Sequence, residues 1–289
     1  MKIIACFLNN RKFRVNHNGG ESSTRHIQAG VPQGSVLAPI LYNIYTSDIP
    51  TSAQVNLALY ADDTAIYTSN RNLRYARLTL QRYLNTLTKW FKDWNINTNQ
   101  AKTKAIIFTR RRPTNPPRLQ MHGRILPYVR AVKYLGVTLD TKLLFNEHID
   151  DLASRGNRAI KMLMPLLRQE TLSTKNKRTL YTSLVRSRLT YAAPAWTTAS
   201  KFRITKLQRI QNKTLRMILR QRKRTPIHQL HNLARLDTIP ELIARQTSKL
   251  ALQITHHNNR LIRLIGNEEP AHRKHVRLAD KLRMAIING

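Results

Sequence analysis

Two adjacent aspartates, Asp62 and Asp63, are the residues of this chain whose type and spacing best suit catalysis. They lie inside an apolar, β-prone run, 57–67, whose polar borders favour two short strands with a tight turn at the acidic pair. Two carboxylates side by side repel each other unless a cation neutralises both. Their hard oxygen atoms suit Mg²⁺ or Mn²⁺, and a pair of such ions clamps an in-line displacement at phosphorus. The alternative is a solvated Asp-Asp turn, because Asp favours turns for local reasons.

A glycine-containing loop lies upstream of this pair. Gly30, Pro32 and Gly34 punctuate a segment whose backbone can approach a ligand closely, and Ser35 is expected to cap a helix that carries apolar residues up to Tyr45. Such a loop at a helix N-terminus suits a phosphate or a base edge. Most helix starts of this kind bind nothing, so this alternative stays open.

Length and composition limit the fold and the partners. The 289 residues can bury a substantial core and allow one or two domains. The chain has 50 Lys and Arg residues against 15 Asp and Glu residues, a formal net charge of +35 that predicts a polyanionic partner. Nucleic acid is favoured over a membrane, because the apolar run 3–8 is far too short to span a bilayer. The single cysteine, Cys6, excludes an internal disulfide framework and a cysteine-based zinc site, and fits a reducing compartment.

The hydrophobic pattern predicts the elements that position these residues. A turn is expected at Gly19-Gly20 and an amphipathic helix at 71–94. Strands or hairpins are expected at 12–15, 105–108, 119–121 and 131–140. From there the chain changes to helices, expected at about 146–168, 173–187, 201–222, 226–235 and 239–265.

Several stretches occur in an order that resembles the palm of reverse transcriptases encoded by non-long-terminal-repeat (non-LTR) retrotransposons. The first are the loop 29–37 and the run Tyr60-Ala61-Asp62-Asp63. Segment 99–103 is similar to the family's fourth palm motif, and segment 133–137 is similar to its primer-grip motif. The runs 191–196 and 207–212 resemble the thumb and the segment after it. The sequence around these motifs looks like the jockey group of elements.

The resemblance implies an α+β fold, with a partial polymerase palm followed by an all-helical thumb and C-terminal region. It places the palm at 1–143, the helical thumb at 144–225 and a helical C-terminal segment at 226–289. The palm sheet is expected to be antiparallel and built around the Asp62-Asp63 hairpin, with the helices that follow Ser35 and Arg71 beside it.

The resemblance also implies an enzyme, an RNA-directed DNA polymerase that joins nucleotides to a primer 3′-hydroxyl with two divalent ions, Mg²⁺ or Mn²⁺. Asp62 and Asp63 would be catalytic metal ligands, and Lys102 would protonate the leaving pyrophosphate. For Lys102 the alternative is a solvated basic loop. Template and nucleotide would lie against Pro32, Gln33, Gly34 and Ser35, and the primer end against Tyr134, Leu135 and Gly136.

The partners implied are an RNA template, a DNA primer or RNA–DNA duplex and a deoxynucleoside triphosphate, without a membrane. The basic thumb helices would follow the duplex by phosphate contacts that are largely independent of sequence. Nuclear residence, beside a cytoplasmic ribonucleoprotein, follows from the family's habit of priming at chromosomal nicks.

One departure from the family is important. Full-length relatives carry a further catalytic aspartate upstream of the Pro-Gln-Gly loop, after a fingers region, whereas Glu21 is the only acid before Asp48 and lies in a polar turn. The chain is therefore expected to be a C-terminal part of the polymerase, inactive or nearly so by itself, whose partner is the missing N-terminal polymerase and endonuclease part. A missing palm strand would leave a sheet edge exposed and lower the solubility.

Other classes of function remain as alternatives. The chain could be a non-catalytic binder of RNA or RNA–DNA duplex, a relic of a retrotransposon. A basic scaffold for an acidic protein would make the polymerase motifs accidental. An intron-encoded maturase or a telomerase-like polymerase would share the palm, but the jockey-like sequence after residue 140 argues against both.

Overall fold

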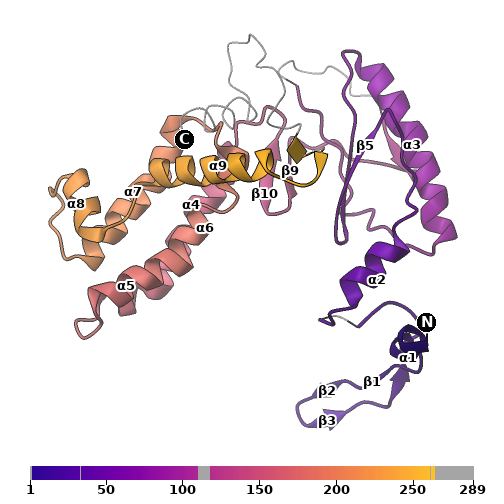
Figure 1. Ribbon diagram of the computed structural model, residues 1–289, viewed down its shortest axis with the longest axis horizontal. Helices are drawn as coiled ribbons and strands as arrows, with labels where there is room; N and C mark the ends of the chain where they lie inside the picture. The colour runs from indigo at the N-terminus through magenta and orange to yellow at the C-terminus, as the bar shows by residue number, and fades with distance from the viewer. Residues whose placement is uncertain (1, 33, 110–117, 261, 264–289) are drawn as a thin grey trace. The chain divides into compact units, whose positions relative to one another are not determined.

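The computed structural model describes residues 2–32, 34–109, 118–260 and 262–263, and Figure 1 shows their helices and strands. The chain forms two compact units. The first comprises residues 1–105 and 114–127, and the second comprises residues 106–113 and 128–289. None of the helices in the described residues is long and apolar enough to cross a membrane.

The first unit opens with helix α1 (Lys2–Leu8) and two small strand pairs. Strand β1 (Lys12–Phe13) pairs with β4 (Arg25–His26), and β2 (Asn16–His17) pairs with β3 (Gly20–Glu21). Asn18 and Gly19 both have positive φ, as the tight turn between β2 and β3 requires. The strand predicted at 12–15 and the turn predicted at Gly19-Gly20 are therefore both present, with shorter strands than expected.

The remaining elements of the first unit surround the acidic pair. They are α2 (Ala38–Tyr45), the hairpin β5 (Asn56–Tyr60) and β6 (Asp63–Tyr67), α3 (Leu73–Asp93) and the hairpin β7 (Gln120–Met121) and β8 (Arg124–Ile125). The amphipathic helix predicted at 71–94 is confirmed as α3: Asn72 caps it, and its apolar face buries Leu84, Leu87, Trp90 and Phe91, among others.

Two polar side chains fix α3 within this unit. The amide of Gln81 donates to the Gln120 carbonyl oxygen and accepts from the Gln120 N–H, both at 2.8 Å, so it takes the place of a neighbouring strand beside β7. The hydroxyl of Tyr83 donates to the Pro50 carbonyl at 2.6 Å, which ties the helix to the chain that leads into the acidic hairpin.

The prediction of a strand at 105–108 is wrong. Ala105 donates its N–H to the Pro127 carbonyl and Thr109 donates to the Thr141 carbonyl, but no continuous ladder forms between them. An apolar run becomes a strand only when another strand lies alongside it, and these two isolated bonds do not supply one.

The second unit contains the hairpin of β9 (Ala131–Tyr134) and β10 (Val137–Asp140), followed by helices. These are α4 (Asn146–Arg168), α5 (Thr174–Leu180), π-helix η1 (Tyr181–Arg186), α6 (Ser187–Leu189), 3₁₀-helix η2 (Ala193–Trp196), α7 (Lys201–Ile218), α8 (Ile227–Ala234) and α9 (Ile239–Thr255). The helices predicted in this region are present, but the one predicted at 239–265 ends at Thr255, and residues 264–265 lie outside the described residues. The one predicted at 173–187 is divided by the π-helical turn.

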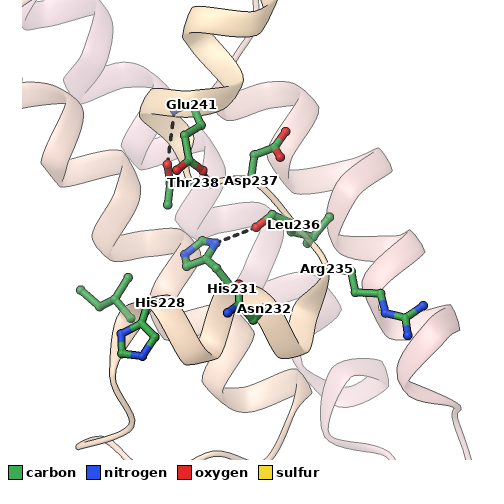
Figure 2. A pocket seen from close by; sticks show the side chains of 9 residues that line it. His228, His231, Asn232, Arg235, Leu236, Asp237, Thr238 and Glu241 are labelled. Atoms are coloured by element: carbon green, nitrogen blue, oxygen red, sulfur yellow. Dashed lines mark hydrogen bonds between the residues drawn. The ribbon is translucent and has the colours of Figure 1, made fainter.

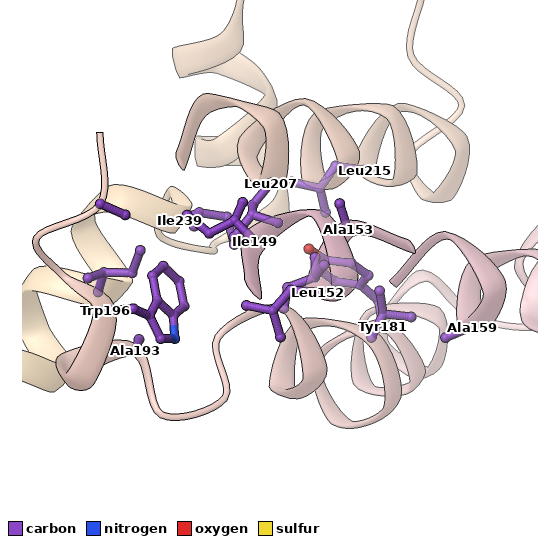
Figure 3. Close-up of a cluster of buried hydrophobic side chains, with 14 of the residues drawn as sticks. Ile149, Leu152, Ala153, Ala159, Tyr181, Ala193, Trp196, Leu207, Leu215 and Ile239 are labelled. Carbon is purple, nitrogen blue, oxygen red and sulfur yellow. The ribbon is translucent and has the colours of Figure 1, made fainter. Parts of the chain in front are cut away.

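A buried cluster holds the helices of the second unit together, as Figure 3 shows. Trp196 and Tyr181 are its largest members, and both are fully buried. Gly156 of α4 allows a close approach, because a Cβ there would lie 2.4 Å from a methyl carbon of Leu189 in α6. The Leu189 side chain of α6 therefore packs directly against the backbone of α4 at Gly156.

Helices and small antiparallel sheets together make the fold α+β, as predicted. The larger palm sheet expected around the Asp62-Asp63 hairpin is not formed in the described residues, where every sheet has two strands and β5 and β6 pair only with each other. The β9–β10 hairpin belongs to the same compact unit as the helices that follow it. The boundaries at 143/144 and 225/226, and the assignment of palm and thumb to these parts, stay predictions.

Candidate functional site

The acidic pair lies at the tip of the β5–β6 hairpin, as predicted. Tyr60 pairs with Asp63 at the end of the ladder, and Ala61 and Asp62 form the two-residue turn. Both carboxylate residues are exposed. The hairpin therefore presents two negative charges to solvent at the end of a short and fully paired ladder.

The turn itself holds a strained residue. Ala61 has φ of 50°, the left-handed region that residues with a Cβ normally avoid at a cost of about 1–2 kcal/mol. Such conformations persist where the surrounding structure enforces them, and they cluster at functional sites. Here the two-residue connection of antiparallel strands imposes the conformation, since a tight hairpin turn requires positive φ at its first position.

Helix α2 supplies a neutral phenol to the acidic tip. Burial, together with the negative charge of Asp62, raises the pKa of Tyr42, so its hydroxyl stays protonated at neutral pH and can donate a hydrogen bond. The end of α2 is fixed by Tyr45, whose hydroxyl donates to the Trp94 carbonyl and whose ring stacks edge-on against the Trp94 ring at 5.0 Å.

The loop before α2 closes on itself. The Ser35 hydroxyl donates to the Pro32 carbonyl at 2.9 Å and accepts from the Ala38 N–H at 3.2 Å. The helix starts at Ala38 and its N-cap residue is Leu37, so the predicted cap position at Ser35 is wrong, although the Ser35 hydroxyl still satisfies the first N–H of the helix. Gly34 has φ of 82°, which favours glycine. Gln33, which is also expected to contact template or nucleotide, lies outside the described residues.

An arginine that the sequence did not single out holds the start of this loop. The Arg11 guanidinium donates to the carbonyls of Ala29 and Gly30 and, through Nε, to the Leu8 carbonyl at 3.0 Å. It therefore links the end of α1 to the glycine-containing loop.

Lys102 lies in a turn after α3. Its backbone N–H donates to the carbonyl and to the side-chain oxygen of Asn99, both at 3.1 Å, and the residue is exposed. Within the described residues no ion pair joins its ammonium group to Asp62 or Asp63. The structure brings Asp62 and Asp63 together and leaves Lys102 as a basic group on a turn of the same unit.

The carboxylates fit a divalent ion that keeps further ligands of its own. In the described residues, no group of three or more His, Cys, Asp and Glu side chains could hold a metal ion. Mg²⁺ retains several waters and is commonly bound by one or two carboxylates together with substrate phosphates. Two exposed aspartates at a hairpin tip satisfy that requirement, whereas a structural site would need a full set of protein ligands.

The predicted primer-grip residues lie at the tip of the other long hairpin. Leu135 and Gly136 form the turn between β9 and β10 with φ of 45° and 81°, and Tyr134 pairs with Val137 beside it. The far end of this hairpin is fixed by Asp140, whose carboxylate accepts from the N–H groups of Lys142, Leu144 and Phe145.

A pocket in the second unit is lined partly by side chains that are bonded within the fold (Figure 2). Glu241 accepts from the Thr238 N–H, the Thr238 hydroxyl accepts from the Glu241 N–H, and His231 Nδ1 contacts the Leu236 carbonyl at 2.9 Å. Asp237 pairs with Arg245 at 2.6 Å. Four of the side chains that line the pocket, those of His231, Asp237, Thr238 and Glu241, are therefore engaged in contacts within the fold.

Comparisons with known proteins identify the family. Residues 1–139 match the family model described as reverse transcriptase (RNA-dependent DNA polymerase). Among curated proteins, the chain is 35% identical over 225 residues to the RNA-directed DNA polymerase from mobile element jockey of Drosophila melanogaster, covering 75% of this chain and 24% of that protein.

Two further relatives extend the match along the chain. The probable RNA-directed DNA polymerase from transposon BS of Drosophila melanogaster is 33% identical over 94% of this chain, and that from transposon X-element is 31% identical over 94%. This chain covers 31% and 30% of their lengths. No solved structure matches the chain significantly. The chain belongs to the reverse transcriptases of non-LTR retrotransposons, and it spans about a quarter to a third of these relatives.

Proposed function

We propose that this chain is part of an RNA-directed DNA polymerase that extends a primer 3′-hydroxyl on an RNA template. The observation that carries the proposal is the Asp62-Asp63 hairpin tip, two exposed carboxylates on a strained turn inside a chain of the reverse transcriptase family. The template, the primer and the deoxynucleoside triphosphate are the partners it requires, and Mg²⁺ or Mn²⁺ is its metal.

The hairpin tip would hold the metal. Divalent ions at Asp62 and Asp63 would supply charge neutralisation at the nucleotide phosphates and a lowered pKa for the primer hydroxyl. The protein's own contribution is position: the paired strands keep the two carboxylates adjacent, and the neutral Tyr42 phenol lies close enough to Asp62 for its pKa to respond to that charge. Phosphoryl transfer depends almost entirely on such positioning and electrostatics.

The remaining residues would hold the substrates. The closed loop at Pro32, Gly34 and Ser35 would face template and nucleotide, and the β9–β10 turn at Leu135 and Gly136 would support the primer end. Lys102, exposed on its turn, is the proposed donor to the leaving pyrophosphate.

Metal binding tests the proposal without requiring turnover. Because two carboxylates need phosphate oxygens to complete the shell, we expect weak Mn²⁺ binding by the purified chain that tightens at least about tenfold with primer–template and nucleotide. Electron paramagnetic resonance of Mn²⁺ measures this directly. Asp62→Asn and Asp63→Asn should abolish the tightening. Asp93→Asn, at the exposed end of α3, is the matched control and should leave it unchanged.

Primer extension tests the activity itself. Because Glu21 is the only acid before Asp48, we expect this chain by itself to be weakly active or inactive. Any metal-dependent DNA synthesis on an RNA template should be lost in both hairpin variants and kept in the Asp93 variant. Lys102→Ala should lower the rate while leaving Mn²⁺ binding intact, because a proton donor acts on the leaving group and not on the metal. Synthesis that survives both aspartate substitutions would contradict the metal role.

A non-catalytic binder of RNA or RNA–DNA duplex is the second candidate. The observation that favours it is charge: the ion pairs in the described residues engage only Arg14, Arg155, Arg203, Lys206, Arg220 and Arg245, whereas the chain has 50 Lys and Arg residues. A binder should hold duplex with equal affinity before and after Asp62→Asn and show no metal-dependent tightening. In a polymerase, Asp62→Asn should change the affinity for duplex and should remove the metal-dependent tightening.

A further inference from the structure

The tip of the β9–β10 hairpin is held by a tyrosine that lies 56 positions further along the chain. The Tyr191 hydroxyl donates to the Leu135 carbonyl at 3.2 Å. Its ring lies against Gly136, where a Cβ would come within 2.8 Å of the ring carbon Cε1. Gly136 therefore serves two purposes, since it adopts a φ of 81° and leaves room for the ring.

The backbone of Tyr191 is itself fixed by the core. The indole Nε1 of Trp196, a fully buried residue, donates to the Tyr191 carbonyl at 2.9 Å. Ala192 adopts φ of 51° and Ala193, which follows it, is fully buried, so the segment between Thr190 and Trp196 turns back over the core. The Tyr191 side chain, 49% exposed, projects from this anchored turn.

A second contact returns from the same core to the hairpin. The rings of Trp196 and His148 meet edge to face at 5.9 Å, and His148 Nδ1 accepts from the Thr138 N–H of β10 at 3.3 Å. The hairpin is thus connected to Trp196 along two routes, one at its tip through Tyr191 and one along β10 through His148. Only the first route touches the residues that resemble a primer grip.

We propose that Tyr191 is a positioning residue, which holds the Leu135-Gly136 tip so that the primer's terminal nucleotide is presented in one fixed position. This inference rests on the proposed polymerase function. Tyr191 does not need to touch the primer: it acts through Leu135 and Gly136, because a two-stranded hairpin alone is only marginally stable and its tip moves unless it is tied down. Affinity for the duplex comes mainly from phosphate contacts elsewhere and should not depend on this tie.

The experiment compares the full chain with Tyr191→Phe, Tyr191→Ala and the control Tyr75→Phe, which alters a tyrosine 62% exposed on α3. Hydrogen exchange of the amides at 131–140 measures the tie, and 2-aminopurine at the primer's 3′-terminal position measures the order of the primer end. We expect tip amides to exchange about fivefold faster in Tyr191→Phe and faster still in Tyr191→Ala. The terminal probe should brighten, with duplex affinity and unfolding temperature nearly unchanged in Tyr191→Phe.

A double-mutant cycle separates the ring contact from general damage. Gly136→Ala should disturb the tip more in the wild-type chain than beside Tyr191→Ala, because the ring it collides with is then absent, while the cost of positive φ is common to both. Additive effects would show that the ring does not press on the tip.

Each outcome decides the point. Unchanged hydrogen exchange of the tip amides in Tyr191→Phe would show that the Tyr191 hydroxyl does not hold the tip. Faster exchange with unchanged 2-aminopurine fluorescence would contradict the positioning role. If duplex affinity and the unfolding temperature both fall, Tyr191 stabilises the fold in general and is not a positioning residue. Failure of the wild-type chain to bind primer–template contradicts the proposed function and the positioning role with it, whereas the exchange measurement still decides the tie itself.

Discussion

His148 is a buried histidine that folding keeps neutral. It is fully buried at the start of α4, and burial, with the nearby charges of Arg155 and Lys133 adding to it and Asp151 opposing it, lowers its pKa from 6.5 to about 4. Its Nδ1 accepts from the Thr138 N–H, so the neutral ring carries its proton on Nε2, which finds no partner among the described residues.

The lowered pKa makes stability depend on pH. Above pH 6.5 the His148 ring is neutral in the folded and in the unfolded chain. Between pH 6.5 and about 4 the ring is protonated in the unfolded chain but stays neutral in the folded chain. The free energy of unfolding should therefore fall by up to about 3 kcal/mol as the pH drops through that window. His148→Asn, whose side-chain oxygen can still accept from Thr138, should remove this part of the fall.

Chemical denaturation at pH 7, 5.5 and 4.5 measures the effect as a change in slope, so a constant loss from the smaller side chain does not matter. His228→Asn, at an exposed position of α8, is the control and should keep the wild-type slope. An identical pH dependence in both variants would mean that folding does not lower the pKa of His148.

The left-handed residue at the acidic tip gives a second prediction at this scale. Ala61→Val should destabilise the β5–β6 hairpin by about 1–2 kcal/mol, because a β-branched side chain tolerates φ of 50° worse than Ala does. The same change at Ala65, inside β6, should be nearly neutral because strands favour β-branched residues. Hydrogen exchange across 56–67 reports both, and equal effects at the two positions would exclude strain as the cause.

Sequence identified some residues of the site and could not identify others. The position of Asp62 and Asp63 at a hairpin tip was predictable because the turn and its flanking strands are encoded within a dozen neighbouring residues, whereas their metal role stays a proposal. The relation of Tyr42 to Asp62 and that of Tyr191 to Leu135 were not predictable, since each joins residues that are brought together only by the fold.

At the scale of elements, hydrophobic periodicity was a good guide to helices and a poorer guide to strands. Helices α3, α4 and α9 follow apolar steps of three and four, which depend on local sequence alone. The strand expected at 105–108 failed because its ladder needs a partner that no local pattern specifies. The π-helical turn η1 was missed for the same reason: tertiary packing around buried Tyr181 accompanies it, and no residue type signals it.

A buried glutamine of helix α7, Gln211, bonds to two neighbouring segments. Gln211 accepts from the Tyr181 hydroxyl of η1 at 2.9 Å and donates to the Asp237 carbonyl before α9 at 2.7 Å. Gln211→Leu removes the hydrogen bonds to the buried Tyr181 hydroxyl and to the part-buried Asp237 carbonyl, and should lower the free energy of unfolding by about 2–4 kcal/mol.

Thermal or denaturant unfolding measures this loss against Gln253→Leu, an exposed position on α9 where the change should stay within about 0.5 kcal/mol. Adding Tyr181→Phe to Gln211→Leu should recover part of the loss, because the stranded hydroxyl is then gone. If the losses in the free energy of unfolding caused by Tyr181→Phe and Gln211→Leu simply add, the Tyr181 hydroxyl and the Gln211 amide do not stabilise each other.

At the scale of the whole molecule, charge should govern binding. Duplex affinity should fall steeply with salt, because Lys and Arg side chains that bind phosphates release counterions. Side chains already paired with an acid release fewer counterions, so the slope should depend on which Lys and Arg residues are replaced. Replacing Arg222 and Lys223, exposed between α7 and α8, by Ala should flatten the slope by up to about 2. Replacing Arg203 and Lys206, which both pair with Asp150, should flatten it less; an equal change would contradict this account.

The two units should also differ in stability. The main buried cluster draws all its residues from Val137 to Ile243, so residues 128–289 contain a complete core. In the first unit, strands of two residues predominate, and Tyr60, Tyr67 and Ile44 expose 65%, 56% and 62% of their surface. The fragment 128–289 should therefore unfold cooperatively with near-ultraviolet dichroism from Trp196, whereas 1–127 alone should be poorly soluble because its hairpin edges can pair with other chains. Broad, non-cooperative melting of fragment 128–289 would show that its core depends on the first unit.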